Sequence, residues 1–222
     1  MPNHAQLLTL ALAALIAAGC QKDEPEPVDL GYDYFPRKVG AWIDYQVDSI
    51  FRDDAFSIHD TTSYVLREKV VEAYTDPAGR AAWRIHRFVK TPSGDWLIRD
   101  VWTSTRDAFY AEVTEENMRR LKLSFPIRTS RSWDMNVYNA DDELSVAPVE
   151  VDVPWSAGAL SFEQTTMVKN TVPANFVDRN EMHERYAKGI GLVYTFREIA
   201  NVQTSGYEGF KLTATIIDFG QD

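Results

Sequence analysis

The sequence predicts an all-β domain, mainly antiparallel, built either as a sandwich or as one strongly curved sheet that closes toward a barrel. Three observations lead to this prediction. Apolar and polar residues alternate with period two, as in residues 41–48, which is typical of half-buried strands. Turn residues interrupt the pattern at short intervals, and long helical patterns are almost absent. Consecutive strands without intervening helices favour antiparallel pairing.

The elements are expected to follow one another in a single domain. The predicted strands are residues 41–48, 62–74, 82–90, 96–104, 108–113, 118–125, 149–153, 162–169, 192–198 and 211–219. At most one short helix is expected, over residues 114–121, where Thr114 is suited to the N-cap position. No Gly- or Ser-rich boundary divides the body, so residues 32–222 are predicted to form one β-rich domain.

Composition excludes several classes of protein. The chain has 222 residues, of which 45% are hydrophobic, which is enough for a packed core. Lys and Arg number 23 against 33 Asp and Glu, a formal net charge of −10. This acidic balance argues against a nucleic-acid partner, because such partners are bound mainly through Lys and Arg. A single cysteine excludes a disulfide framework, a CxxC redox site and a multi-cysteine zinc site.

The N-terminus has the pattern of an export signal. Residues 7–18 read LLTLALAALIAA, which is too short to span a membrane but suits the apolar region of a signal peptide. The tetrad Ala17-Ala18-Gly19-Cys20 that follows resembles the lipobox of bacterial lipoproteins. That resemblance implies that residues 1–19 are a signal peptide cut just before Cys20. It also implies that Cys20 carries a diacylglycerol on sulfur and an acyl group on the new amine, which together hold the protein on a membrane.

The residues after the cysteine predict a tether. Residues 20–31 begin with a charged, Pro-rich stretch that cannot bury enough apolar surface to order itself. Within it, Lys22, Asp23 and Glu24 resemble a short signal that some Gram-negative bacteria use to move lipoproteins to the outer face of the outer membrane. The expected location is therefore the outer membrane, surface-exposed, with the periplasmic face as the alternative.

A register can be predicted for the strands over residues 82–90 and 96–104. A four-residue loop, Pro92-Ser93-Gly94-Asp95, would place opposite charges directly across the ladder, which is stabilising. The predicted pairs are Ile85 with Trp102, Arg87 with Asp100 and Val89 with Ile98. This register places on one face the residues that we predict as ligand-face candidates: Trp83, Arg87, Trp96, Asp100 and Trp102.

No catalytic, metal-binding or cofactor-binding motif stands out. Three histidines remain after signal cleavage, His59, His86 and His183, without the spacing of metal ligands. The segment Glu181-Met182-His183-Glu184 lacks the HExxH arrangement of a zinc protease. The segment Gly189-Ile190-Gly191 lacks the third glycine and the helix of a pyrophosphate-binding loop. We therefore predict no catalytic residue, no metal and no cofactor.

Three segments resemble a family of uncharacterised bacterial outer-membrane lipoproteins. They are residues 34–45 (YFPRKVGAWIDY), residues 123–126 (LSFP) with Ser132-Trp133, and residues 184–193 (ERYAKGIGLV). Ala41 stands where the family more often has Asn. The resemblance implies a β-rich extracytoplasmic domain with a curved sheet or partial barrel. The family has no established activity, so no catalytic residues are carried over.

Together these observations predict a lipid-anchored, non-enzymatic binding or assembly module of the cell envelope. Its partners would be the membrane and either a hydrophobic or glycan ligand on a concave sheet or an envelope protein. The alternative is a structural accessory subunit of a surface complex. A hydrolase whose site is assembled from residues distant in sequence is the third hypothesis.

Overall fold

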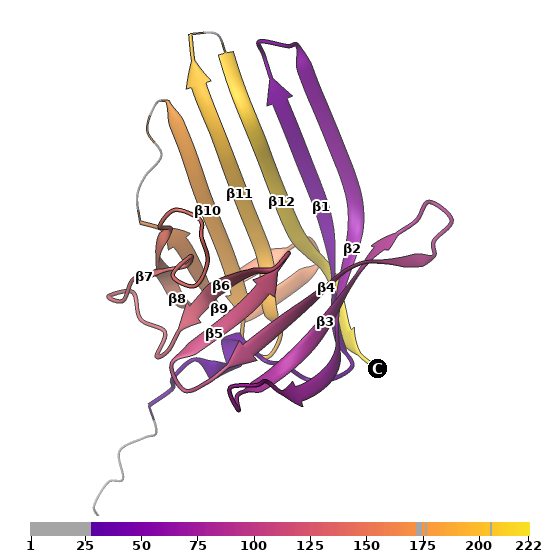
Figure 1. Cartoon of the computed structure of the whole chain (residues 1–222). Coiled ribbons are helices and arrows are strands. Elements are labelled where there is room, and N and C mark those ends of the chain that lie inside the picture. The colour runs from indigo at the N-terminus through magenta and orange to yellow at the C-terminus, as the bar shows by residue number, and fades with distance from the viewer. Residues whose placement is uncertain (1–27, 172–174, 176, 205) are drawn as a thin grey trace, which may run out of the picture.

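The computed structural model describes residues 28–171, 175, 177–204 and 206–222, and it confirms an all-β, antiparallel fold (Figure 1). Twelve strands form one sheet in the order β6-β5-β4-β3-β2-β1-β12-β11-β10-β9-β8-β7. The strands are β1 (Ala41–Asp53), β2 (Ile58–Thr75), β3 (Ala81–Lys90), β4 (Trp96–Arg106), β5 (Tyr110–Glu115), β6 (Met118–Ser124), β7 (Trp133–Asp134), β8 (Ser145–Ala157), β9 (Leu160–Asn170), β10 (Asp178–Ala187), β11 (Gly191–Gln203) and β12 (Gly206–Gln221). A 3-10 turn, η1 (Tyr32–Tyr34), precedes them.

The sheet curves until its two edge strands nearly meet. Strands β1 and β12 pair at its centre, and each half of the chain continues outward from them as a meander. At the far edges, the amide of Leu121 in β6 donates to the carbonyl of Met135 at 2.9 Å. The indole Nε1 of Trp133 in β7 donates to the carbonyl of Leu121 at 2.9 Å. These contacts hold the sheet as an almost closed barrel.

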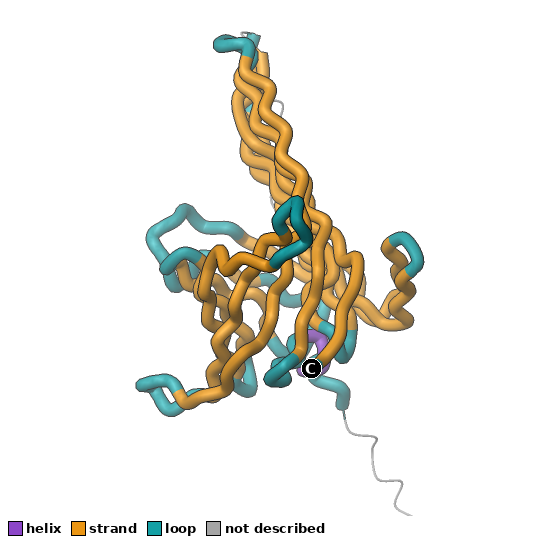
Figure 2. The backbone as a smooth tube through the Cα atoms, turned by 90° about the vertical axis from the view of Figure 1, so that its right-hand side faces the viewer, coloured by secondary structure: helices purple, strands orange, loops and turns teal. Residues whose placement is uncertain are grey.

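Five strands extend beyond the barrel as a single-layered sheet, which we call the blade. It consists of residues 50–53 of β1, 58–61 of β2, 178–181 of β10, 198–203 of β11 and 206–211 of β12, paired in that part of the sheet. Figure 2 shows this extension nearly edge-on. Because no second layer covers it, apolar residues of the blade remain accessible: Ile50 is 43% exposed and Phe51 is 42% exposed.

The opposite end of the barrel, which we call the base, is closed by the main hydrophobic core. Tyr34, Phe35 and Phe125 are each 1% exposed there. The ring of Tyr32 packs edge-on against Phe125 at 4.9 Å between centroids. The amide of Gly189 donates to the carbonyl of Asp33 at 2.8 Å. Parts of all three segments that resemble the lipoprotein family therefore lie close together at the base, where they pack the core.

The prediction of a helix over residues 114–121 is wrong. These residues form the turn and adjoining strand ends of the β5–β6 hairpin, in which Glu115 pairs with Met118. The two turn residues, Glu116 and Asn117, have φ values of 47° and 64°. Positive φ at both central positions is the geometry of a tight hairpin turn that follows the twist of the strands.

The predicted β3–β4 register is half right. Ile85 pairs with Trp102 and Arg87 with Asp100, as expected, but Val89 pairs with Leu97 rather than Ile98. The loop is one residue longer than predicted, since the amide of Thr91 bonds to the carbonyl of Asp95. A bulge at residue 99 absorbs the extra residue. Each residue of β4 before the bulge consequently faces the opposite side from the one predicted.

The predicted signal peptide and most of the predicted tether, with Cys20, Lys22, Asp23 and Glu24, lie outside the described residues. Near the end of the predicted tether, the carboxylate of Asp29 pairs with Lys188 at 2.7 Å, and Gly31 is buried. The chain therefore already contacts the base at residue 29. In the described part of the molecule, no helix has the length and apolar character to cross a membrane.

Candidate functional site

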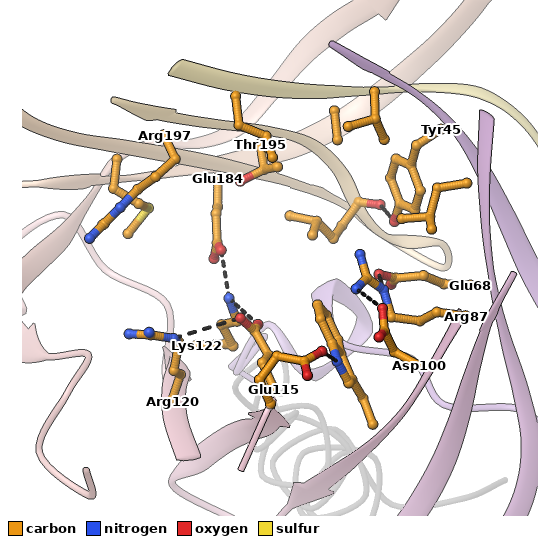
Figure 3. A pocket seen from close by; sticks show the side chains of 18 of the residues that line it. Tyr45, Glu68, Arg87, Asp100, Glu115, Arg120, Lys122, Glu184, Thr195 and Arg197 are labelled. Atoms are coloured by element: carbon orange, nitrogen blue, oxygen red, sulfur yellow. Dashed lines mark hydrogen bonds and ion pairs between the residues drawn. The ribbon is translucent and has the colours of Figure 1, made fainter. Parts of the chain in front are cut away.

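The barrel interior contains a cavity of about 610 Å³ that reaches the foot of the blade (Figure 3). Eight strands give a barrel just wide enough to be filled by side chains, so a nearly closed sheet of twelve strands leaves space inside. The lining is amphipathic. Besides tyrosines, one tryptophan and two methionines, it includes six aliphatic residues: Val47, Leu66, Leu192, Ile199, Leu212 and Ala214. A smaller pocket of about 60 Å³ lies on the side of the base.

The apolar wall arises from strand alternation on β1, β2 and β12. Val47 pairs with Ala214 in β12 and with Tyr64 in β2, so the three share one face of the sheet. Leu66, two residues beyond Tyr64, points the same way. Val47 and Leu66 are each 2% exposed. The row continues onto the blade, where Phe210 also lines the cavity.

The opposite wall carries a buried ion cluster of Glu115, Lys122 and Glu184. The ammonium of Lys122 lies 2.7 Å from a carboxylate oxygen of Glu115 and 2.7 Å from one of Glu184. Burial alone would lower the pKa of Lys122, but the two carboxylates raise it above its usual range. The hydroxyl of Tyr186 donates to Glu184, and burial beside this carboxylate raises the pKa of Tyr186. This cluster links β6 to β10 across the barrel.

A second ion cluster lies on β2, β3 and β4. The guanidinium of Arg87 pairs with Glu68 and with Asp100, each at 3.0 Å, because the three residues face one another in the ladder. The same guanidinium stacks on the ring of Trp102, 3.6 Å from its centroid. The indole nitrogen of Trp102 donates to Glu116 at 3.0 Å. One face of Trp102 is therefore covered, and its polar atom is satisfied within the protein.

Three of the five predicted ligand-face residues line the cavity: Arg87, Asp100 and Trp102. Trp83 faces the same side but pairs with Ser104, whose hydroxyl accepts from Arg37 near the base. The prediction that Trp96 shares this face is wrong. It precedes the β4 bulge and contacts Arg67, whose guanidinium lies 4.4 Å from the Trp96 ring centroid.

Other predicted residues are placed away from the cavity. Among the described residues, none of the three histidines, His59, His86 and His183, lines it. No group of three or more His, Cys, Asp or Glu side chains there is arranged to hold a metal ion. Sequence reasoning missed Glu115, Lys122, Glu184 and Arg197. In the sequence each is an ordinary charged residue of a strand, and only the barrel brings them together.

Comparisons with known proteins find solved structures that are similar to this chain at low sequence identity. No protein-family model matches the chain, and no curated protein matches it. A crystal structure described as "a putative exported protein with YmcC-like fold" from Bacteroides fragilis is 14% identical, with a TM-score of 0.40, over 84% of this chain and 98% of that one. A "putative lipoprotein" from Parabacteroides distasonis is 10% identical, with a TM-score of 0.46, over 88% of this chain and 100% of that one.

Proposed function

We propose that the protein is a lipid-anchored, non-enzymatic lipoprotein of the cell envelope that holds the apolar part of a ligand inside its barrel. The observation that carries this proposal is the cavity of about 610 Å³ with a continuous aliphatic wall. A volume of this size is within the range of small-molecule sites. The lipobox at Cys20 supports the anchor.

Within this proposal, a hydrocarbon chain fits better than a glycan. Sugar rings are commonly held by stacking on an aromatic face, but one face of Trp102 is covered by Arg87. The aliphatic wall instead presents the buried Val47 and Leu66 and the partly buried Leu212, which offer dispersion contacts and no hydrogen bonds. A hydrolytic role is less well supported, because the described histidines lie outside the cavity and five of its six carboxylates are engaged in ion pairs.

The proposal predicts that the protein retains an apolar ligand during purification. The full chain with Cys20→Ser, which removes the predicted acylation site, should carry a non-covalent apolar molecule in native mass spectrometry without detergent. Leu212→Glu places a carboxylate on the aliphatic wall and should lower the bound fraction at least tenfold. Lys211→Glu, one residue earlier and on the other face of β12, is the matched control and should keep the ligand. A parent protein that is ligand-free and takes up no added alkyl compound would contradict the proposal.

Cys20 is expected to determine where the protein is found. Lipid attachment through two or more chains is effectively permanent. The protein with Cys20 intact should therefore sediment with outer membranes and resist extraction by salt. Cys20→Ser should move at least nine-tenths of it into the soluble fraction or block its processing. Replacing Lys22, Asp23 and Glu24 by Ala tests surface exposure separately, because the protein should then stay membrane-bound but become inaccessible to protease on intact cells. Unchanged fractionation of Cys20→Ser would refute the anchor.

A structural accessory role is the second candidate, and one observation favours it. The blade exposes Phe56, which is 77% accessible at the β1–β2 turn, together with Ile50 and Phe51. Exposed apolar groups of this kind are found at protein–protein contacts. This role concerns the blade, whereas the ligand-holding role concerns the cavity, so Leu212→Glu separates the two.

A further inference from the structure

Four of the five cationic side chains that line the cavity are neutralised by carboxylates. Arg87 and Arg99 contact Asp100 at 3.0 and 3.3 Å, and Lys122 contacts Glu184 at 2.7 Å. Arg120 lies 3.1 Å from Asp141. The fifth cation is Arg197 of β11, which has no hydrogen bond, ion pair or ring contact with any residue in the described part of the chain. Figure 3 shows its guanidinium apart from both ion clusters.

The residues that pair with Arg197 on the two neighbouring strands are apolar. Its cross-strand neighbours are Met182 in β10 and Leu212 in β12, and Met182 is 3% exposed. Ile199 lies two residues along the same face of β11. Burial and the charge of Arg120 lower the pKa of Arg197, whereas the charges of Glu184, Asp141 and Glu115 raise it. A guanidinium in a protein stays protonated near neutral pH. The Arg197 guanidinium is therefore charged, makes no hydrogen bond or ion pair with the described residues, and lies beside the aliphatic wall.

The carboxylates of the cavity do not offer an equivalent site for a cation. Glu68, Asp100, Glu115, Asp141 and Glu184 each contact an Arg or Lys. The sixth lining carboxylate, Glu116, is exposed and accepts a hydrogen bond from Trp102. A cationic group inside the cavity would find no free buried carboxylate among the described residues, whereas an anion would find Arg197.

We infer that the ligand is an anionic amphiphile, with its carboxylate or phosphate head on Arg197 and its hydrocarbon chain along Leu212, Ala214, Val47 and Leu66. This inference rests on the proposed function and names its ligand class. Leu212 pairs with Arg197 on the neighbouring strand β12, and Ala214 lies two residues further along that strand. Val47 and Leu66 continue the wall across β1 and β2. A guanidinium binds carboxylate and phosphate oxygens bidentately, which fixes the position of the head group. The tail contributes binding free energy in proportion to the apolar area that it buries.

The test compares ligands that share a tail and differ in their head. The full chain with Cys20→Ser, stripped of lipid, is titrated with dodecanoate, dodecyl phosphate and dodecanol by displacement of neutral N-phenyl-1-naphthylamine. Acetate and inorganic phosphate are added alone as heads without a tail, with binding measured by calorimetry. At least one dodecyl anion should bind tenfold or more tightly than dodecanol. The stronger anion then tells a fatty-acid head from a phosphate monoester.

Substitutions at Arg197 assign the effect to that residue. Arg197→Gln should weaken the preferred anion at least tenfold and leave dodecanol within twofold, and Arg197→Lys should retain part of the preference. Lys211→Gln removes a charge from the opposite face of β12 and should change neither. Circular dichroism and urea unfolding establish that each variant is folded. If Arg197→Gln does not fold, anion binding by Arg197→Lys is compared with that of the parent chain.

The outcomes separate the two proposals. If dodecanol binds as tightly as both anions, or if Arg197→Gln leaves anion binding unchanged, the inference about the head is overturned while the apolar cavity stands. If inorganic phosphate or acetate binds as tightly as its dodecyl counterpart, the site takes a free anion and the amphiphile is overturned. If no dodecyl compound binds to the parent chain, the proposed function itself fails.

Discussion

Lys122→Met is expected to lower the free energy of unfolding by about 3–5 kcal/mol, because it leaves two carboxylates of the barrel interior without their shared cation. Glu184 is 4% exposed, and its carboxylate and that of Glu115 both lie 2.7 Å from the ammonium of Lys122. Native domains are stable by only about 5–15 kcal/mol, so a loss of this size removes a large share. Urea unfolding of the Cys20→Ser chain at pH 7, followed by tryptophan fluorescence, measures it.

The control keeps the same chemical change and moves it to the surface. Lys211→Met alters an exposed lysine of β12 and should change the unfolding free energy by no more than about 0.5 kcal/mol. Adding Glu184→Gln to Lys122→Met removes one of the stranded charges and should recover part of the loss. If Lys122→Met alone lowers the unfolding free energy by less than about 1 kcal/mol, and not by the amount expected for a broken buried ion pair, then water or rearrangement satisfies both carboxylates.

Stability is also expected to fall steeply above about pH 10, the usual pKa of tyrosine and close to that of lysine. Burial raises the pKa of Tyr45 and Tyr186, and the neighbouring carboxylates raise that of Lys122 against the effect of burial. Above the unfolded pKa values of these three groups, each releases its proton in the unfolded chain and keeps it in the folded protein. Each group then lowers the unfolding free energy by about 1.4 kcal/mol per pH unit, or about 4 kcal/mol per unit together. Below about pH 9 these groups leave stability unchanged, because they are protonated in both states.

Removing one of these hydroxyls tests the assignment. Tyr45 donates to the carbonyl of Leu192 at 2.7 Å, so Tyr45→Phe will have a fixed cost that is measured at pH 7 and subtracted. Above pH 10 its stability should fall less steeply than that of the parent, by about 1.4 kcal/mol per pH unit. An unchanged slope would mean that Tyr45 does not contribute to the alkaline loss.

Strand alternation predicted most of the sheet but could not predict its irregularities. The ladder between β3 and β4 shows why. The predicted register pairs Arg87 with Asp100, and the structure has the same pair. The loop between the strands is one residue longer than predicted, however, and a bulge at residue 99 compensates for it. A bulge inserts one residue at little energetic cost and leaves no pattern in the sequence, yet it reverses the face of every residue beyond it. For this reason the side of the sheet predicted for Trp96 is wrong.

Two strands were not predicted, for different physical reasons. Strand β10 reads DRNEMHERYA and places Glu184 inside the barrel, so its inward positions do not look apolar. Its inward charge is tolerated only because Lys122 lies opposite, 62 residues away in sequence. Strand β7 has two residues and is too short for a periodic pattern.

The candidate site was the least predictable part. Arg87, Asp100 and Trp102 could be identified because neighbouring strands bring them together. The ion cluster around Lys122 joins strands from opposite halves of the chain, and Arg197 becomes distinctive only when every other cation of the cavity is seen to have a carboxylate partner. The absence of a partner is a property of the folded barrel and cannot be predicted from one strand.

The closed base and the open blade give the molecule a direction. Asp29 and Gly31 join the domain at the base, as does the C-terminus through the amide of Asp222 to Gly40, whereas the blade extends from the other end (Figure 1). If Cys20 is the anchor that we propose, the anchoring membrane lies on the side of the base, and the end of the cavity at the foot of the blade lies farther from it. A ligand taken from that membrane would have to pass around the barrel. Loading and unloading would then take place with whatever approaches from the far side, either a second membrane or a passing carrier.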